Sequence, residues 1–214
     1  MKLFVVLLAG LFLTNSCVNF NSTAISIAHA GELYDVPKGV YYFPIGSFTE
    51  FNDNAKPDTM LLSWYSRMLR AMKEPVLYDK VEGTETYRFT CLRTFHAPFA
   101  IRVSKQGQAP ANLMVKISDG AGGYSSENLV STSAKQISDE EWAQITEALN
   151  KNDFWNMPTQ KISSGSDGSE WIVEGVKNGK YHVVDRWTPQ KGTDYRLIGE
   201  KLIEVSGTKF RPLY

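Results

Sequence analysis

The sequence predicts an α+β fold: an antiparallel sheet of five or six strands, a meander plus a C-terminal hairpin, with about three helices packed on one face. Three runs between residues 87 and 117 alternate apolar and polar side chains, as strands of an antiparallel sheet do. Asn178-Gly179 separates two further β-rich runs and is typical of a two-residue hairpin turn. Three other segments carry apolar residues at helical spacing. A chain of 214 residues is long enough for one domain with a sizeable core.

The first residues are typical of an export signal. Lys2 precedes an uncharged apolar run, residues 3–13, which is too short to span a membrane. We therefore expect residues 1–30 to be an export signal and residues 31–214 to form a single globular domain. The expected location is the periplasm of a bacterial cell envelope, or its outer membrane in the case of a lipoprotein.

Two processing sites remain open for this signal. Ala28-His29-Ala30 is a good small-x-small cleavage site, but it lies far beyond the apolar run. Cys17 lies at the distance expected for lipoprotein processing, although Thr14 occupies a position where leucine is preferred. A lipid on Cys17 is the one membrane link we expect, because no later segment reaches the roughly 18 apolar residues of a transmembrane helix.

The segment before the meander is expected to hold one helix. Residues 31–54 mix aromatic residues with glycine and proline, which predicts irregular structure with a short edge strand at 39–43. A helix is predicted from about 58 to 73, with Pro75 ending it. Its apolar residues recur at helical spacing, and they are Leu61, Trp64, Tyr65, Met68 and Met72.

The meander is predicted to consist of strands at 87–95, 99–103 and 113–117. The inward-facing set, with Arg93 and Asp119 in the same phase, comprises Tyr87, Phe89, Cys91, Phe99, Ile101, Val103, Leu113, Val115 and Ile117. The outward-facing set includes Arg88, His96, Arg102 and Lys116. Cys91 is the one cysteine left once the signal is removed, so we expect no disulfide within the chain and a small buried side chain instead.

Beyond the meander, one more short strand is expected at 129–133. Ser138 and Glu141 form a capping box that predicts the start of the second helix. Thr193 is predicted to begin the last helix, and Gly207 to end it.

The hairpin around Asn178-Gly179 has a register that its two-residue turn dictates, in which Trp171 faces Arg186. Because side chains alternate, its residues fall into two sets. The more apolar set is expected to face the core and comprises Ile172, Glu174, Val176, Tyr181, Val183, Asp185 and Trp187. The other set is expected to be partly exposed, with Trp171 and Arg186 as a cation–π pair, and comprises Trp171, Val173, Gly175, His182, Val184 and Arg186.

Charge and motifs argue against several functional classes. Lys plus Arg and Asp plus Glu balance at 23 each, so bulk charge favours neither nucleic acid nor an anionic membrane surface. The sequence contains no His-Glu-x-x-His, Cys-x-x-Cys or Gly-x-Ser-x-Gly motif. His96 and His182 lie far apart with no metal-binding spacing, so we expect no metal and no other cofactor.

Cationic and aromatic side chains on the outward side of the sheet form the principal candidate binding site. It comprises Trp171, His182, Arg186, Arg102 and His96. Such a surface suits an acidic protein or another envelope macromolecule. The sequence therefore favours a non-enzymatic binding module, and a merely solvated polar face is the alternative.

A second group of polar residues occupies inward phases: Arg93, Asp119, Glu174 and Asp185. These could pair into a buried network, which is usually structural, although perturbed carboxylates also mark catalytic sites. The alternative function is therefore a small hydrolase in which Glu174, Asp185 and His182 act as acid/base groups. An enzyme should have a concave pocket where these carboxylates converge, whereas a binding module should present a flat cationic and aromatic face.

Several segments together resemble a family of exported bacterial proteins of uncharacterised function. They are Trp64-Tyr65-Ser66, Lys73-Glu74-Pro75, Tyr87-Arg88-Phe89, residues 92–96 and residues 167–189. The similarity covers most of the chain after residue 60. It implies an exported globular domain and no particular activity.

Overall fold

The structure is a computed structural model, and it describes residues 41–214 except for 51–52, 80–82, 162 and 164. The predicted export signal and Cys17 lie outside the described residues. So does the first part of the predicted edge strand at 39–43, and its described part, residues 41–43, is not in a strand.

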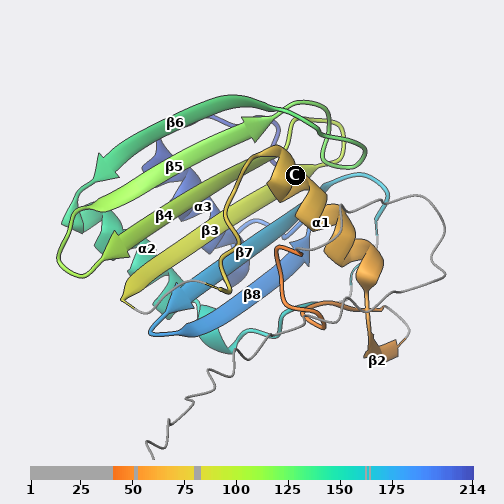
Figure 1. The fold of residues 1–214 in the computed structure, drawn as a ribbon, viewed down its shortest axis with the longest axis horizontal. Coiled ribbons are helices and arrows are strands. Elements are labelled where there is room, and N and C mark those ends of the chain that lie inside the picture. Colours follow the sequence, from red (N-terminus) through yellow and green to blue (C-terminus); the bar gives the residue numbers. More distant parts are fainter. Residues whose placement is uncertain (1–40, 51–52, 80–82, 162, 164) are drawn as a thin grey trace, which may run out of the picture. The chain divides into compact units, whose positions relative to one another are not determined.

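A six-stranded antiparallel sheet forms the centre of the domain, in the order β6-β5-β4-β3-β7-β8 (Figure 1). Its strands are β3 (Thr84–Arg93), β4 (Phe99–Gln106), β5 (Ala111–Ser118), β6 (Leu129–Ile137), β7 (Ser169–Lys177) and β8 (Lys180–Trp187). The hairpin β7–β8 joins the meander beside β3, so the first strand of the meander lies in the interior of the sheet. This arrangement confirms the predicted α+β fold.

Within the described residues, three α-helices and one short 3-10 helix accompany the sheet. They are α1 (Thr59–Ala71), α2 (Asp139–Lys151), α3 (Asp194–Ser206) and η1 (Phe154–Asn156). A separate two-stranded sheet pairs β1 (Thr49–Glu50) with β2 (Asp53–Pro57), just before α1.

The helix ends follow from local chemistry. Asp58 precedes α1, and its side chain accepts a hydrogen bond of 2.9 Å from the Leu61 amide. The predicted capping box of Ser138 and Glu141 is present at the start of α2. Gly207 follows α3 in the left-handed conformation, with φ of 72°, as predicted for a helix stop.

The helices cover both faces of the sheet, which corrects the expectation that they pack on one face. Helices α2 and α3 pack on the face that carries Phe89 and Trp171, whereas α1 packs on the face that carries Ile172 (Figure 1). The physical reason is that both phases of β3 are buried, since every residue from 86 to 93 is buried. One of these phases includes the charged Arg88. Apolar and polar residues therefore alternate along β3 as they would in a strand with one exposed face.

The hairpin has the predicted register. Strands β7 and β8 pair Trp171 with Arg186 near the open end of the hairpin. At the turn, Asn178 and Gly179 have φ of 52° and 73°, as a type I′ turn requires. The prediction of strand pairing from this dipeptide is therefore confirmed.

The predicted exposure of one hairpin face is wrong. Trp171 is fully buried beneath α3, and the hydroxyl of Tyr195 in that helix donates a hydrogen bond to the Trp171 carbonyl. The cation–π partners also differ: Arg196 lies over Trp171 at 4.8 Å, and Arg186 lies over Tyr195 at 5.4 Å. Because α3 folds back over this face, it supplies the aromatic and cationic partners that we had expected from within the hairpin.

Candidate functional site

A cleft of about 750 Å³ opens beside the end of the hairpin, between β1, the start of α1 and the segment that follows η1. Trp187 and Leu61 contribute apolar surface to it. Its charged lining residues are four carboxylates and one ammonium group, namely Glu50, Asp58, Glu170, Asp185 and Lys161. Among the described residues, the cleft therefore has a marked excess of acidic groups.

Two of these acids, Glu170 and Asp185, lie next to each other because of the hairpin register. Glu170 pairs with Trp187 and Ile172 pairs with Asp185, so the two acids are diagonal neighbours on one face of β7 and β8. Their carboxyl groups are close enough to form a hydrogen bond with each other. Two carboxyl groups can do so only if one of them carries a proton.

Helix α1 places Tyr65 against this carboxyl pair. The Tyr65 hydroxyl donates a hydrogen bond of 3.0 Å to Oδ2 of Asp185. The Tyr65 ring is fully buried and packs edge-on against Phe43 and Phe48, which hold it in position. Oδ1 of Asp185 is also buried, and no N–H or O–H donor of the described residues reaches it. Only a proton on the neighbouring carboxyl, or a ligand, can satisfy that oxygen.

Burial alters the protonation of the pair. It raises the pKa of Asp185 to about 6. Burial and the adjacent Asp185 carboxylate raise the pKa of Glu170 well above the usual range of a carboxyl group. Arg186 opposes the shift at Asp185, but its guanidinium donates hydrogen bonds to backbone carbonyls rather than to either carboxyl group. Above about pH 6, and below the raised pKa of Glu170, the pair therefore holds one proton and one negative charge.

The segment 157–161 forms one wall of the cleft, and β8 holds it in place. The Asp185 amide donates a hydrogen bond of 2.7 Å to a carbonyl of this segment. The Arg186 guanidinium donates two more, of 2.8 and 2.9 Å. Nε2 of His182 lies 3.0 Å from a further carbonyl of the same segment. Two residues predicted for a binding surface therefore position the wall of the cleft.

The other residues of the predicted binding surface lie elsewhere. Trp171 is in the core beneath α3. Arg102 lies on the α1 face of β4 and donates a hydrogen bond of 2.8 Å to Glu74. His96 lies in the turn between β3 and β4, where its Nδ1 is 3.0 Å from the Tyr214 hydroxyl. The structure does not bring the five residues onto one surface, because opposite strand phases and a turn separate them.

The four residues of the predicted inward network are not brought together either. Arg93 faces the α2–α3 side and donates a hydrogen bond of 2.6 Å to the Ala97 carbonyl. Asp119 accepts hydrogen bonds from residues 127 and 128 of its own loop. The physical reason is that the apolar phases of the meander and of the hairpin face opposite sides of the sheet.

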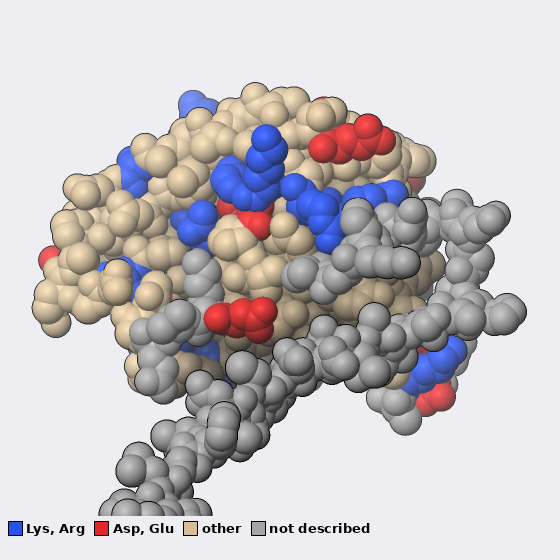
Figure 2. All heavy atoms as spheres, in the orientation of Figure 1, with Lys and Arg blue, Asp and Glu red and all other residues tan. Residues whose placement is uncertain are grey.

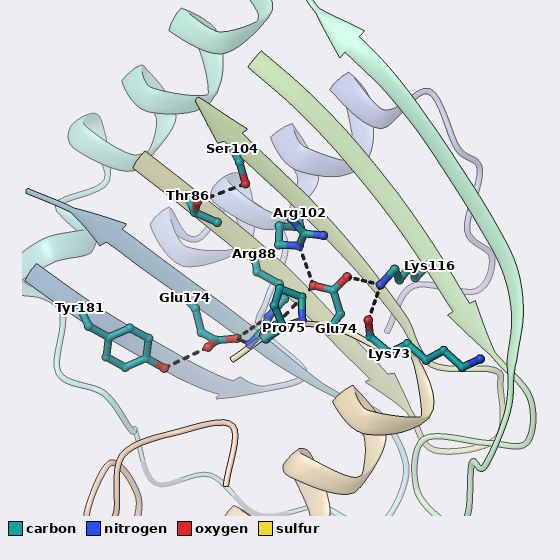
Figure 3. Close-up of polar contacts among 10 residues, drawn as sticks. All are labelled: Lys73, Glu74, Pro75, Thr86, Arg88, Arg102, Ser104, Lys116, Glu174 and Tyr181. Atoms are coloured by element: carbon teal, nitrogen blue, oxygen red, sulfur yellow. Dashed lines mark hydrogen bonds and ion pairs between the residues drawn. The ribbon is translucent and has the colours of Figure 1, made fainter. Parts of the chain in front are cut away.

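Glu174 belongs to a different cluster, a buried ion-pair network beside the end of α1 (Figure 3). Nη2 of Arg88 lies 2.6 Å from Glu174, and Nη1 of Arg88 lies 3.4 Å from Glu74. Arg102 and Lys116 contact the same Glu74 carboxylate at 2.8 and 3.2 Å. Although burial opposes it, these three cations hold the pKa of Glu74 below its usual value. Figure 2 shows basic side chains gathered around acidic groups on this side of the sheet.

The predicted acid/base set of Glu174, Asp185 and His182 therefore does not form one site. Glu174 is paired with Arg88, away from the cleft lining. His182 projects from the opposite face of β8 to Asp185, where burial lowers its pKa. Of the predicted set, Asp185 alone lines the cleft.

Sequence analysis did not single out Glu170 and Tyr65 as site residues. Extending the hairpin register by one pair would have placed Glu170 opposite Trp187 and on the same face as Asp185. Tyr65 was expected only as a core residue of its helix. Its contact with Asp185 joins positions 120 residues apart in the sequence, and no local pattern indicates it.

Comparisons with known proteins add no assignment to this site. Neither a scan against protein-family models nor a search of curated proteins finds a match to this chain. The resemblance to exported bacterial proteins therefore stays a prediction.

Other chemistry within the described part of the chain is sparse. No group of three or more His, Cys, Asp or Glu there is arranged to hold a metal ion. The helices described are too short or too polar to span a membrane. Cys91 is a free thiol buried in the core, as predicted, and burial raises its pKa to about 12.

Proposed function

We propose that this chain is an exported cell-envelope protein that acts as a binding module and takes a small polar ligand in the acidic cleft. Support for export comes from the uncharged apolar run at residues 3–13. Support for the binding site comes from one observation. The half-buried Glu170 and the buried Asp185 form a carboxyl pair that lines the cleft, and one oxygen of Asp185 has no hydrogen-bond donor among the described residues.

The contrast between the two acidic clusters of the α1 face supports this proposal. Glu174 and Glu74 both contact arginine side chains, so the fold compensates their charge. Among the described residues, no lysine or arginine side chain forms an ion pair with Glu170 or Asp185, and Asp185 accepts a hydrogen bond from the Tyr65 hydroxyl. Burying a carboxylate without a cation costs stability, and such uncompensated groups are concentrated at functional sites. A ligand would complete the interactions that the fold leaves open.

The proposal moves the binding site from the basic face to the cleft. Arg102, Arg186 and His96 each interact with a group of the same chain. Binding an acidic protein through them would require those contacts to break. The cleft instead offers carboxylates, Trp187 and free space in one place.

The cleft can be tested by blocking it. Ser47→Trp places a bulky ring in the lining, whereas Ile45→Trp alters an exposed residue of the same loop that does not line the cleft. The labelled mature chain would be titrated with the low-molecular-mass fraction of an envelope extract and followed by NMR. We expect shifts at Thr159, Gln160 and the Trp187 indole in the wild type and in Ile45→Trp, but not in Ser47→Trp. Shifts that persist in Ser47→Trp, or none at these residues in the wild type, would contradict the proposal.

A second candidate function is acid–base hydrolysis at the same pair. The observation that favours it is the position of two acids side by side in the cleft lining, because a carboxyl group and a carboxylate in contact can act as acid and base together. The ionised acid would accept a proton from an attacking water, and the protonated acid would donate one to the leaving group. Asp185 and Glu170 fill these roles, instead of the set with Glu174 and His182 expected from the sequence.

Hydrolysis would be tested with chromogenic esters, anilides and glycosides between pH 4 and 8. Turnover by the wild type that is lost in both Asp185→Asn and Glu170→Gln would favour the enzyme. Ligand binding without turnover of any substrate would favour the binding module.

A further inference from the structure

The charges of the cleft indicate what kind of ligand it takes. Four carboxylates line it against one ammonium group, that of Lys161, whose side chain is exposed. A negatively charged ligand would meet repulsion from these acids. Trp187 lies in the same lining, and an aromatic ring attracts cations.

We infer that the cleft accepts an organic cation, an ammonium or guanidinium group, whose positive charge replaces the proton held between Glu170 and Asp185. This inference rests on the proposed function and specifies its ligand class. Before binding, the pair holds one proton. On binding, that proton passes to solvent, both carboxyl groups are ionised, and the cation keeps its own protons and donates hydrogen bonds. One such bond would satisfy Oδ1 of Asp185, which has no donor among the described residues.

The groups that face the pair are compatible with this exchange. Tyr65 of α1 donates to Asp185, and burial raises its pKa well above the usual tyrosine value, so it stays neutral. Asp58 at the start of α1 and Glu50 of β1 add negative charge to the lining. Among the described cations, Lys56 is paired with Glu50 at 2.6 Å, Lys161 lines the cleft, and the Arg186 guanidinium is engaged with the cleft wall. The net field therefore favours a positive ligand group.

Other ligand classes fit the described lining less well. A metal ion needs several ligands at once, and no group of three or more metal-binding side chains is arranged for one among these residues. A neutral polyol could form hydrogen bonds, but it would leave the shared proton in place. Release of a proton on binding is therefore the signature of a cation.

A pair of matched probes tests the inference. Butylguanidinium carries the planar cation, and butylurea is its neutral counterpart of nearly the same shape. Each would be titrated into the mature wild-type chain by calorimetry at pH 7, in two buffers with different ionisation enthalpies. We expect butylguanidinium to bind with a buffer-dependent heat that corresponds to release of up to one proton. We expect butylurea to bind at least about tenfold more weakly.

Variants locate the effect and separate this inference from the proposed function. Glu170→Gln keeps a hydrogen-bonding side chain but removes one acid, and should weaken butylguanidinium binding about tenfold or more and abolish proton release. Glu140→Gln, an exposed change on α2, should alter neither. If butylurea binds as well as butylguanidinium and Ser47→Trp blocks both, the cation inference fails and the cleft proposal stands. If butylguanidinium binds equally well to Ser47→Trp, or does not bind, the inference fails.

A free amine and a basic side chain of a peptide share this chemistry. Agmatine and an acetylated, amidated arginine residue would be compared in the same experiment. Tighter binding of agmatine would indicate a free amine, and tighter binding of the capped residue would indicate a peptide.

Discussion

At the scale of single residues, the protein contains two ways of burying carboxylates. Glu174 and Glu74 are neutralised by Arg88, with Arg102 and Lys116 at the edge of the same cluster. Removing one partner of such a buried pair typically costs about 3–5 kcal/mol, so this cluster holds the sheet to the segment after α1. Glu170 and Asp185 have no such ion-pair partner in the part of the chain that the structure describes, and this difference distinguishes the candidate site from the supporting network.

The raised pKa values at the pair predict a pH-dependent stability. An acid whose pKa is raised on folding contributes stability below its unfolded value, and loses it as the pH rises through the folded value. For Asp185 this stability is lost between pH 3.8 and about pH 6. The pKa of Glu170 is also raised, so its contribution is likewise lost as the pH rises. At pH 7 the free energy of unfolding of Glu170→Gln should therefore exceed that of the wild type by about 1–3 kcal/mol, so the variant unfolds at a higher temperature. At pH 4 the two should differ little.

Thermal unfolding from pH 4 to pH 8 would check this prediction, with Glu140→Gln as the control for loss of one surface charge. A Glu170→Gln curve parallel to that of the wild type over the whole range would mean that the pair is not perturbed as the structure indicates.

At the scale of elements, most of the sheet could be predicted from the sequence because its signals are local. Asn178-Gly179 determined the hairpin register, and alternation revealed the first three strands of the meander. The faces could not be predicted, because β3 buries both phases and one of them contains Arg88. For the same reason the sequence grouped Glu174 with Arg93, whereas the register places it against Arg88. Contacts that depend on packing between elements left no pattern along the chain.

The turn of the hairpin provides a direct prediction. Gly179 has φ of 73°, and a side chain added there would meet no atom within 4 Å. Gly179→Val should therefore cost about 1–3 kcal/mol through backbone strain alone, and Asn178→Ala should cost less. Urea unfolding measures both. Equal and negligible effects of the two changes would contradict a type I′ turn.

The segment 157–161, which forms one wall of the cleft, provides another testable prediction. Arg186 donates hydrogen bonds to the carbonyls of Pro158 and Thr159. Arg186→Ala should release segment 157–161 and leave the sheet intact, because the strand pairing does not depend on this side chain. Hydrogen exchange should quicken for amides of that segment, and not for those of β3. Unchanged protection of the segment would show that Arg186 does not hold the wall.

At the scale of the whole molecule, the sheet is covered on both faces, and the cleft lies where the coverage by α1 and β1 meets the end of the hairpin. Elements far apart in the sequence, from residue 46 to residue 187, contribute to it. The site thus depends on the complete fold of the domain, which is why a scan for sequence motifs did not find it.

Export is also a property of the whole chain. We predict that the mature protein is found in the cell envelope or the medium, because residues 3–13 form an uncharged apolar run behind Lys2. Cell fractionation of the wild type and of Cys17→Ser checks both processing routes. Full-length protein in the cytosol would refute export. Membrane association that survives Cys17→Ser would rule out a lipid anchor at that residue.

The central claim is that Glu170 and Asp185 share a proton inside the cleft. Carboxyl carbon signals of the two residues, followed by NMR between pH 3 and 9, test it most directly. The account predicts coupled transitions, with Asp185 ionising near pH 6 and Glu170 at higher pH. Independent transitions of both residues near pH 4 would contradict it.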